Sequence, residues 1–379
     1  MKDTQSIFRK YLLWPLMILF LFACSEEQEM VPTPTTLEGK LTQFIERNQS
    51  ENAPGFSIAV RKDNQLAYQN SRGIARVADK APITTNTQFR IGSITKPMTA
   101  IAIMQLKEAG KLSLEDKLLS YYPELPQSFA EITIEHLLSH RSGLLDYIDD
   151  NTDISSLDNL PTSVVLGFFH DSGLQNLNFT PGTSGRYSNT GFVLLALIIE
   201  KITGMSYPAY LEQNIFNPSG MTNSFVISEK EHLGDHGDKY ALSFGTDIKV
   251  KGFNSLIYGA SGVVSTINDM VLFTDALLNY QLISQESLAS MTQTVGTVYD
   301  IGTDYGLGWL TGTGNHWHTG FITDPNDFWH PGGFDGYRTV LAINPDLDYE
   351  VVVLSNGGET TKDRMWDLLA LVREHYKNQ

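Results

Sequence analysis

The tetrapeptide Ser93-Ile94-Thr95-Lys96 brings together residue types that nucleophilic catalysis needs. Residues i and i+3 of a helix share a face, so the Ser93 hydroxyl and the Lys96 amine can lie within hydrogen-bond reach. An exposed lysine has a pKa of about 10.4 and is a poor base at neutral pH. Burial against an apolar helix would lower that pKa and let the amine assist the hydroxyl. The backbone N–H of Ser93, at the start of a helix, suits a developing oxyanion.

A second candidate group is Tyr187-Ser188-Asn189, which follows a turn-rich stretch and precedes an apolar helical segment. A tyrosine beside a cationic lysine loses its proton more readily and can serve first as a base and later as an acid. Asn189 offers a donor and an acceptor to a substrate amide or ester. The alternative is a turn that ends in a helix cap, with Tyr187 only packed. The similar Tyr68-Gln69-Asn70 lies in a predicted strand before Ser93 and is interpreted as a coincidence.

The third candidate group is His330-Pro331-Gly332-Gly333, just before a predicted strand. Its two glycines would let a substrate backbone approach closely. The N–H of Gly333 is expected to complete an oxyanion pair with that of Ser93, and His330 is expected to bond to Tyr187. A rival is His318-Thr319-Gly320, but the residues after it read as a loop, whereas His330 leads into the last predicted hairpin. His330 is therefore favoured.

Two histidine pairs, His136 with His140 and His232 with His236, have a spacing of four residues that can bind zinc on a helix. Neither pair has the Glu of a His-Glu-x-x-His site between its members. Packed or capping histidines explain both pairs better, so no metal is predicted. The chain also lacks Gly-x-Ser-x-Gly, which excludes the nucleophile-elbow hydrolases.

Hydrophobic periodicity and turn residues predict the elements that must position these groups. Two short strands over Pro54–Ala75 form a hairpin around Lys62-Asp63-Asn64-Gln65, and a nearly all-round apolar helix runs from Met98 to Leu106. The other predicted elements are helices at Ile134–Leu138, Ser163–His170, Phe192–Ile202, Tyr207–Phe216, Asn268–Leu278 and Lys362–His375, and strands at Tyr337–Ile343 and Tyr349–Leu354.

Strands at both chain ends with helices between them predict an α+β fold. One antiparallel sheet is built from the two ends and flanked by helices, and the middle is an all-helical insertion. The domain is expected to cover residues 37–379, with a sheet lobe at about 37–92 and 300–379 and a helical lobe at about 93–299. A substrate pocket is expected between the two lobes.

Composition and charge limit the class of protein. The chain has 379 residues, of which 41% are hydrophobic and 18% are charged. These values exclude a disordered tail, a collagen-like fibre and a polytopic membrane protein. The 43 acidic and 27 basic side chains give a formal net charge of -16, which argues against nucleic acid as a partner. A single cysteine excludes an intrachain disulfide.

The N-terminus reads as a targeting segment. Basic residues precede the apolar stretch Tyr11–Ala23, which is shorter than the roughly 20 apolar residues that span a bilayer. Cys24 follows directly, so residues 1–23 resemble a bacterial lipoprotein signal with Cys24 as the lipidated residue. Residues 24–36 form an acidic, Pro- and Thr-rich spacer. The mature protein is expected to be exported and lipid-anchored at a bacterial cell-envelope membrane, on its periplasmic or cell-surface face. Ordinary secretion with an inert cysteine is the alternative.

Ser93/Lys96, Tyr187/Asn189 and His330/Gly332 occur in the order of the motifs of the penicillin-recognising serine hydrolases, and the chain resembles that family. The family includes class C β-lactamases, D-alanyl-D-alanine carboxypeptidases, D-aminopeptidases and related esterases. The resemblance implies a β-lactamase/transpeptidase-like fold, acylation of Ser93 with Lys96 and Tyr187 managing its proton, and release of the acyl group by water. It implies no cofactor and no metal. It extends over about 37–376, with further landmarks at 110–116, 134–144, 262–266 and 305–309.

The third motif departs from the family pattern, which implies a change of substrate. Members that hold a terminal carboxylate usually carry hydroxyl residues on both sides of the motif's glycine, where this chain has Pro331 and Gly333. Neither side chain donates a hydrogen bond, although Arg338 could supply the missing charge. The expected substrate is a small molecule or peptide whose amide or ester is cleaved. Either a D-amino-acid peptide, as for a D-alanyl-D-alanine carboxypeptidase, or a small carboxylic ester fits. A class C-like β-lactamase or a non-hydrolytic penicillin-binding sensor is the alternative.

Overall fold

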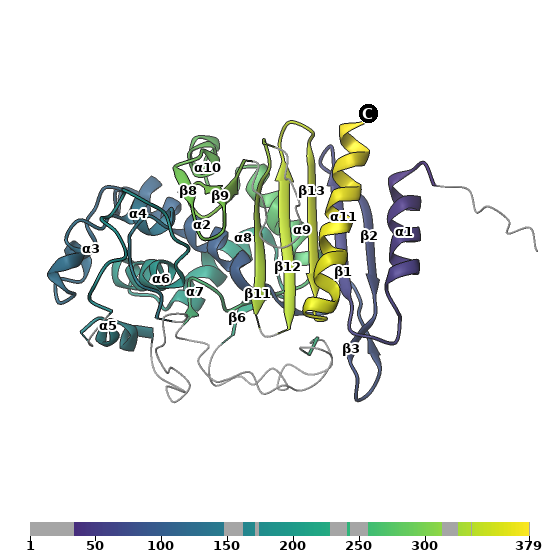
Figure 1. Ribbon diagram of the computed structural model, residues 1–379, viewed down its shortest axis with the longest axis horizontal. Coiled ribbons are helices and arrows are strands. Elements are labelled where there is room, and N and C mark those ends of the chain that lie inside the picture. The colour runs from purple at the N-terminus through teal and green to yellow at the C-terminus, as the bar shows by residue number, and fades with distance from the viewer. Residues whose placement is uncertain are drawn as a thin grey trace, which may run out of the picture. The chain divides into compact units, whose positions relative to one another are not determined.

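An antiparallel sheet of eight strands runs in the order β2-β1-β13-β12-β11-β10-β9-β8 (Figure 1). The N-terminal strand β1 pairs with the C-terminal strand β13 in a continuous register from Phe56↔Ser355 to Lys62↔Tyr349. The α+β fold and the sheet built from both halves of the chain are therefore confirmed. The strands are β1 (Phe56–Lys62), β2 (Gln65–Arg72), β8 (Gly296–Val298), β9 (Thr303–Tyr305), β10 (Leu310–Thr311), β11 (Phe328–Phe334), β12 (Tyr337–Asn344) and β13 (Tyr349–Ser355).

The computed structural model describes residues 34–147, 162–170, 174–227, 241–242, 257–312, 325–334 and 336–378. Pro34–Gln379 form one compact unit. The predictions for the signal segment 1–23, Cys24, His232, His236 and His318 lie outside the described residues.

The central strands are buried on both faces, as a nearly continuous apolar run indicates. In β13, Val353 belongs to a core that includes the helices α1 (Leu37–Asn48) and α11 (Glu359–Lys377), whereas Leu354 belongs to the core on the opposite face. Figure 1 shows α11 lying along β12 and β13. The sheet therefore separates two hydrophobic cores, one under the terminal helices and one shared with the insertion.

Helices α2 (Thr95–Glu108) and α6 (Asn189–Thr203) are apolar on nearly every face, so both are buried in the core shared with the insertion. Ser188 caps α6 by accepting from the N–H of Gly191 at 3.2 Å.

Within the described ranges no single helix is long and apolar enough to cross a membrane, although α6 and 207–219 pass that test as a pair bent by 79°. The remaining helical elements are η1 (Gly92–Ile94), α3 (Leu118–Tyr121), η2 (Gln127–Phe129), α4 (Ile134–Leu138), η3 (Thr162–Val164), α5 (Val165–Phe168), α7 (Tyr207–Leu211), η4 (Glu212–Phe216), α8 (Asn217–Ser219), α9 (Ile267–Leu278) and α10 (Gln285–Thr292).

The insertion between the two halves of the sheet contains short strands as well as helices. β6 (Phe225–Val226) and β7 (Val263–Ser265) form a small sheet with β5 (Phe89–Arg90), in the order β5-β7-β6. A second short pair joins β3 (Ile74–Arg76) and β4 (Ala81–Pro82). The insertion is thus mainly helical rather than all-helical as predicted, because strands of two or three residues are too short to show an alternating pattern.

Helix α1 is absent from the sequence-based prediction because its apolar face is narrow. Leu37, Leu41 and Ile45 recur every four residues and are buried, while most of the other positions are polar. Thr36 starts the helix by accepting from the N–H of Gly39 at 3.1 Å. A single row of apolar side chains gives a weaker helical signal than the broad stripe of a typical surface helix.

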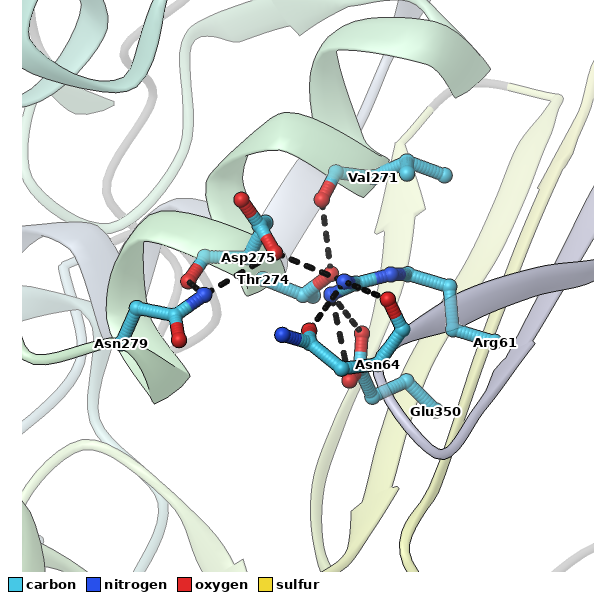
Figure 2. Close-up of polar contacts among 7 residues, drawn as sticks. All are labelled: Arg61, Asn64, Val271, Thr274, Asp275, Asn279 and Glu350. Carbon is cyan, nitrogen blue, oxygen red and sulfur yellow. Dashed lines mark hydrogen bonds and ion pairs between the residues drawn. The ribbon is translucent and has the colours of Figure 1, made fainter.

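A network of ion pairs around the buried Arg61 connects α9 to β1 and β13 (Figure 2). Arg61 in β1 donates through Nη1 to Glu350 in β13 at 3.0 Å and through Nη2 to Asp275 in α9 at 2.7 Å. Arg61 and Glu350 are buried, whereas Asp275 is partly exposed. Burial raises the pKa of the Glu350 carboxyl, although contacts with Thr274 and Arg61 oppose that shift. Arg61 therefore supplies the positive charge that balances the buried Glu350 carboxylate.

Arg61→Met is expected to lower the free energy of unfolding by about 3–5 kcal/mol, because it leaves the buried Glu350 carboxyl without its cationic partner. Lys62→Met is the matched control, since Lys62 pairs with the exposed Asp63 and such surface pairs contribute about 0–1 kcal/mol. Urea unfolding of both variants at pH 7 measures the two costs. Equal costs would contradict the role assigned to the network.

Candidate active site

Ser93 lies in the turn η1, where the chain passes from strand β5 through Gly92 into the buried helix α2. The Ser93 side chain is partly exposed, whereas Lys96 is fully buried one turn later. The Nζ of Lys96 lies 3.1 Å from the Oγ of Ser93. The structure therefore places the serine and the lysine within hydrogen-bond distance, as their spacing predicts.

The Lys96 amine lies within hydrogen-bond distance of several oxygen atoms. Besides the Ser93 Oγ, these include the Asn189 Oδ1 at 2.8 Å and the carbonyl oxygen of Ala260 at 3.0 Å. The last two can only accept, so each takes one N–H of the amine. The Ser93 hydroxyl lies beside the same nitrogen. As an ammonium the nitrogen donates to this hydroxyl, and as a neutral amine its lone pair can accept the hydroxyl proton.

Tyr187 enters the site from the turn before α6, and the Lys96 Nζ lies 4.6 Å from the centre of its ring. The backbone N–H of Tyr187 donates to Asp300 at 3.0 Å. The N–H of Asn189 donates to the buried carboxylate of Asp146 at 2.5 Å. Lys96 and Asn189 are 93 residues apart in the chain, yet the structure brings the predicted serine, lysine, tyrosine and asparagine to one place.

His330 lies within strand β11, and it bonds to Tyr305 instead of Tyr187. Its Nε2 is 3.0 Å from the Tyr305 hydroxyl, and its Nδ1 is 2.7 Å from the carbonyl oxygen of Pro331. A carbonyl oxygen only accepts, so Nδ1 carries the proton and Tyr305 donates to Nε2. The predicted bond between His330 and Tyr187 is therefore wrong: the imidazole is fully buried, Tyr305 takes its free nitrogen, and the His330 and Tyr187 ring centres are 6.3 Å apart.

Strand β11 approaches η1 so closely that only glycine fits at the contact. A Cβ on Gly92, which has a φ of 57°, would lie 2.8 Å from the Gly333 nitrogen. A Cβ on Gly332 would lie 2.1 Å from the carbonyl oxygen of Ile91. Gly332 is therefore needed for the packing of β11 on η1, whereas the prediction placed it against substrate.

The backbone N–H of Gly333 is directed toward η1. Backbone N–H groups alternate in direction along a strand, and β11 pairs with β12 over its whole length. Pro331 has no N–H and is tolerated only on the side that does not face β12. Gly333, two residues later, points the same way and is exposed. This orientation is the one that an oxyanion pair with the Ser93 N–H requires.

The guanidinium of Arg338 is already occupied. Its Nε and Nη2 donate to the Glu359 carboxylate at 3.0 and 2.5 Å, and its Nη1 donates to the carbonyl oxygen of Tyr337 at 2.7 Å. Glu359 also balances the positive charge. The structure therefore does not support the suggestion that Arg338 supplies the charge for a substrate carboxylate.

His140 also lies in this site, although its sequence context indicates only a packed or capping histidine. It is buried, and its ring centre lies 4.3 Å from that of Tyr187 and 4.5 Å from that of Tyr305. His136 has a different role, since its Nδ1 accepts from the N–H of Thr133 at 3.3 Å and caps α4. Among the described residues, no group of three or more His, Cys, Asp or Glu side chains could hold a metal ion. In the sequence, His140 lies within 134–144, one of the stretches that resemble the family.

Burial lowers the pKa of His140 well below its usual value and that of His330 to about 3, and the charge of Lys96 acts in the same direction. In the unfolded chain, His140 and His330 bind protons below a pH of about 6.5. In the folded chain both histidines have lower pKa values, so they stay neutral just below that pH. Stability is therefore unaffected by these groups above that pH and falls as the pH drops toward 3.

The free energy of unfolding is accordingly expected to fall between pH 6.5 and pH 5 by on the order of 1–2 kcal/mol for His330, and the lowered pKa of His140 adds a further loss in the same direction. Urea unfolding at pH 7 and pH 5 measures this loss. His330→Gln should show a smaller loss than the unmodified protein, and His170→Gln, at an exposed position, should not. The same pH dependence in all three proteins would contradict this assignment.

Comparisons with known proteins agree with this fold. A family model described as Beta-lactamase matches residues 41–374. Penicillin-binding protein 4* of Bacillus subtilis (strain 168) is 32% identical over 323 residues, which are 81% of this chain and 69% of that protein. Protein flp of Staphylococcus aureus (strain COL) is 26% identical over 317 residues, which are 81% of this chain and 60% of that protein. The chain therefore belongs to the β-lactamase family of serine hydrolases.

Solved structures give the same fold. An octameric penicillin-binding protein homologue from Pyrococcus abyssi aligns with a TM-score of 0.73 at 27% identity, covering 89% of this chain and 77% of that one. A penicillin-binding protein from Bacillus halodurans aligns with a TM-score of 0.69 at 26% identity, covering 88% and 98%. D-amino acid amidase from Ochrobactrum anthropi SV3 aligns with a TM-score of 0.71 at 24% identity, covering 89% and 98%, which is a likeness of fold alone.

Proposed function

We propose that this protein hydrolyses an amide or ester through an acyl-enzyme on Ser93. The observation that carries the proposal is the position of the Lys96 amine. Asn189 and Ala260 accept from this amine, and the Ser93 Oγ lies 3.1 Å from the same nitrogen. A base held in this way is oriented toward the proton that it must remove before any substrate binds.

The reaction has two steps. The Ser93 oxygen attacks the substrate carbonyl carbon, and its proton passes to the Lys96–Tyr187 pair and then to the departing amine or alcohol. Water next attacks the acyl ester, and Ser93 regains a proton as the carboxylic acid leaves. The N–H groups of Ser93 and Gly333 stabilise the oxyanion in both steps. His330 stays neutral because burial lowers its pKa to about 3, and its Nε2 orients Tyr305 by accepting from the Tyr305 hydroxyl.

The third motif favours acyl donors that do not need a carboxylate anchor. Pro331 and Gly333 offer no side-chain donor, and Arg338 is paired with Glu359. D-amino-acid amides and small carboxylic esters carry no carboxylate and fit such a site best, whereas a D-amino-acid peptide would have to bind without a side-chain partner for its terminal carboxylate. Because the site has no side-chain donors for a carboxylate, a substrate without a carboxylate leaves no such donor unpaired and loses little binding energy. A carboxylate-bearing β-lactam should therefore be a weaker substrate.

The name of the Bacillus subtilis relative supports a second candidate, in which a penicillin acylates Ser93 and is released slowly. The same chemistry begins both reactions, and only the rate of the water step differs. Acylation that is followed by turnover supports the hydrolase, and acylation that persists supports the penicillin-binding sensor.

The test is a screen of the purified full chain against D-Ala-D-Ala peptides, D-amino-acid amides, short p-nitrophenyl esters and nitrocefin. A fluorophosphonate probe with peptide mass spectrometry identifies the modified residue in parallel. We expect labelling at Ser93 and turnover of a peptide, an amide or an ester at a higher kcat/KM than nitrocefin. Absence of any label on Ser93 would overturn the proposal.

We also propose that the protein is exported and that Cys24 carries a lipid. The pattern of basic residues, a short apolar stretch and a cysteine supports it. In a bacterial host, a metabolically supplied fatty-acid label should appear on the protein and disappear in Cys24→Ser, which should leave the membrane fraction. Equal labelling of both proteins would contradict the anchor without affecting the assignment of the active site.

A further inference from the structure

The backbone on both sides of Tyr187 is held by His140. His140 follows α4 and Tyr187 precedes α6, two helices that pack against each other (Figure 1). The carbonyl oxygen of His140 accepts from the N–H of Arg186 at 3.0 Å, and its Nδ1 accepts from the N–H of Ser188 at 3.1 Å. Its imidazole also packs on the Tyr187 ring, with the two planes at 36°. Tyr187 is thus held through both chain neighbours and through one face of its ring.

The bond to Ser188 defines the protonation state of His140. A backbone N–H can only donate, so Nδ1 is unprotonated and the ring proton is on Nε2. A second proton, placed on Nδ1, would break this bond and put an imidazolium cation near Lys96. Burial and the Lys96 charge both lower the pKa of His140, which keeps the ring neutral. The acceptor for Ser188 is therefore present throughout the physiological pH range.

The backbone of His140 is in a conformation that few side chains adopt. Its φ is 59°, in the left-handed region that is uncommon for residues other than glycine. Such conformations persist where the surrounding structure determines the position strongly, and they cluster at functional sites. In this conformation both the carbonyl oxygen and the Nδ1 of His140 reach the segment around Tyr187.

We infer that His140 is a positioning residue for Tyr187, which it holds beside the Lys96 amine without itself exchanging a proton. The inference rests on the proposed acyl-enzyme function and deepens it. A role in packing alone would require only an aromatic ring of similar size. The role inferred here additionally requires a hydrogen-bond acceptor at the Nδ1 position, and this difference makes the two roles separable by experiment.

Two substitutions separate the ring from the acceptor. His140→Phe keeps an aromatic ring and removes the acceptor, whereas His140→Asn keeps an acceptor near the Nδ1 position and tolerates a positive φ. We expect kcat to fall about 100-fold in His140→Phe with little change in KM, because a displacement of about 1 Å at a catalytic group costs about that much. His140→Asn should recover about tenfold of this loss. His136→Gln, the matched control near the same helix, should keep the activity of the unmodified protein.

The deciding measurement is a double-mutant cycle with Tyr187→Phe, read as the rate at which a fluorophosphonate modifies Ser93. If His140 acts through Tyr187, adding His140→Phe to Tyr187→Phe should change this rate by less than about threefold. The full loss of about 100-fold in both backgrounds would overturn the inference. Should His140→Phe not fold in thermal unfolding, His140→Gln, which moves the acceptor toward the Nε2 position, takes its place. Failure of Ser93 to react in the unmodified protein would instead overturn the proposed function, so the two failures are distinguishable.

Discussion

Ser93→Ala is expected to abolish hydrolysis, with kcat/KM reduced by on the order of 10⁴–10⁶-fold, because no acyl-enzyme can form without the hydroxyl. The protein should remain folded. The Ser93 side chain is partly exposed, and the Lys96 amine keeps its bonds to Asn189 and Ala260 when the Ser93 hydroxyl is removed. Steady-state kinetics on the best substrate of the screen measure the loss, and thermal unfolding verifies the fold.

Ser128→Ala is the matched control for this variant. Ser128 is exposed, and its hydroxyl donates to the carbonyl oxygen of Gln175. Its loss should leave kcat/KM unchanged. A Ser93→Ala protein that kept activity within about tenfold of the unmodified protein would exclude Ser93 as the nucleophile, because removal of a nucleophile costs far more than that.

Lys96→Ala is expected to reduce turnover nearly as far as Ser93→Ala, since a nucleophile and its base act as a unit. Tyr187→Phe removes only the phenol oxygen and should cost about 10²–10⁴-fold, the range of a general acid–base group. Single-turnover acylation and steady-state kinetics of both variants measure these losses and separate the acylation step from the water step.

Lys96 is fully buried, so its removal also leaves the Asn189 and Ala260 oxygens without the amine. Thermal unfolding therefore has to accompany the kinetics, and Lys96→Met, which keeps most of the side-chain volume, provides a second variant. Lys107→Ala, at an exposed position near the other end of α2, controls for the loss of a lysine from this helix. Unchanged rates in folded Lys96→Met or in Tyr187→Phe would contradict the proposed proton path.

Short-range sequence patterns predicted one contact of the site and several elements of the fold. Helix geometry alone places residues i and i+3 on one face, so the contact between Ser93 and Lys96 follows from their spacing. The all-round apolar segments predict buried helices at α2 and α6, and the apolar runs near the C-terminus predict the two strands that became β12 and β13. These features depend on short-range periodicity, which the sequence expresses directly.

The amino-acid sequence by itself determined the buried helices α2 and α6 and the strands β1, β12 and β13, and it determined that Ser93 and Lys96 lie together, but it did not predict α1 or β11. The tertiary structure decided the partners of the remaining groups: Tyr305 for His330, Glu359 for Arg338, and the backbone around Tyr187 for His140. Each of these contacts joins side chains or backbone atoms from different elements. Hydrogen bonds form only over distances of about 2.7–3.2 Å, so their partners depend on how the sheet and the helices pack and not on spacing along the chain.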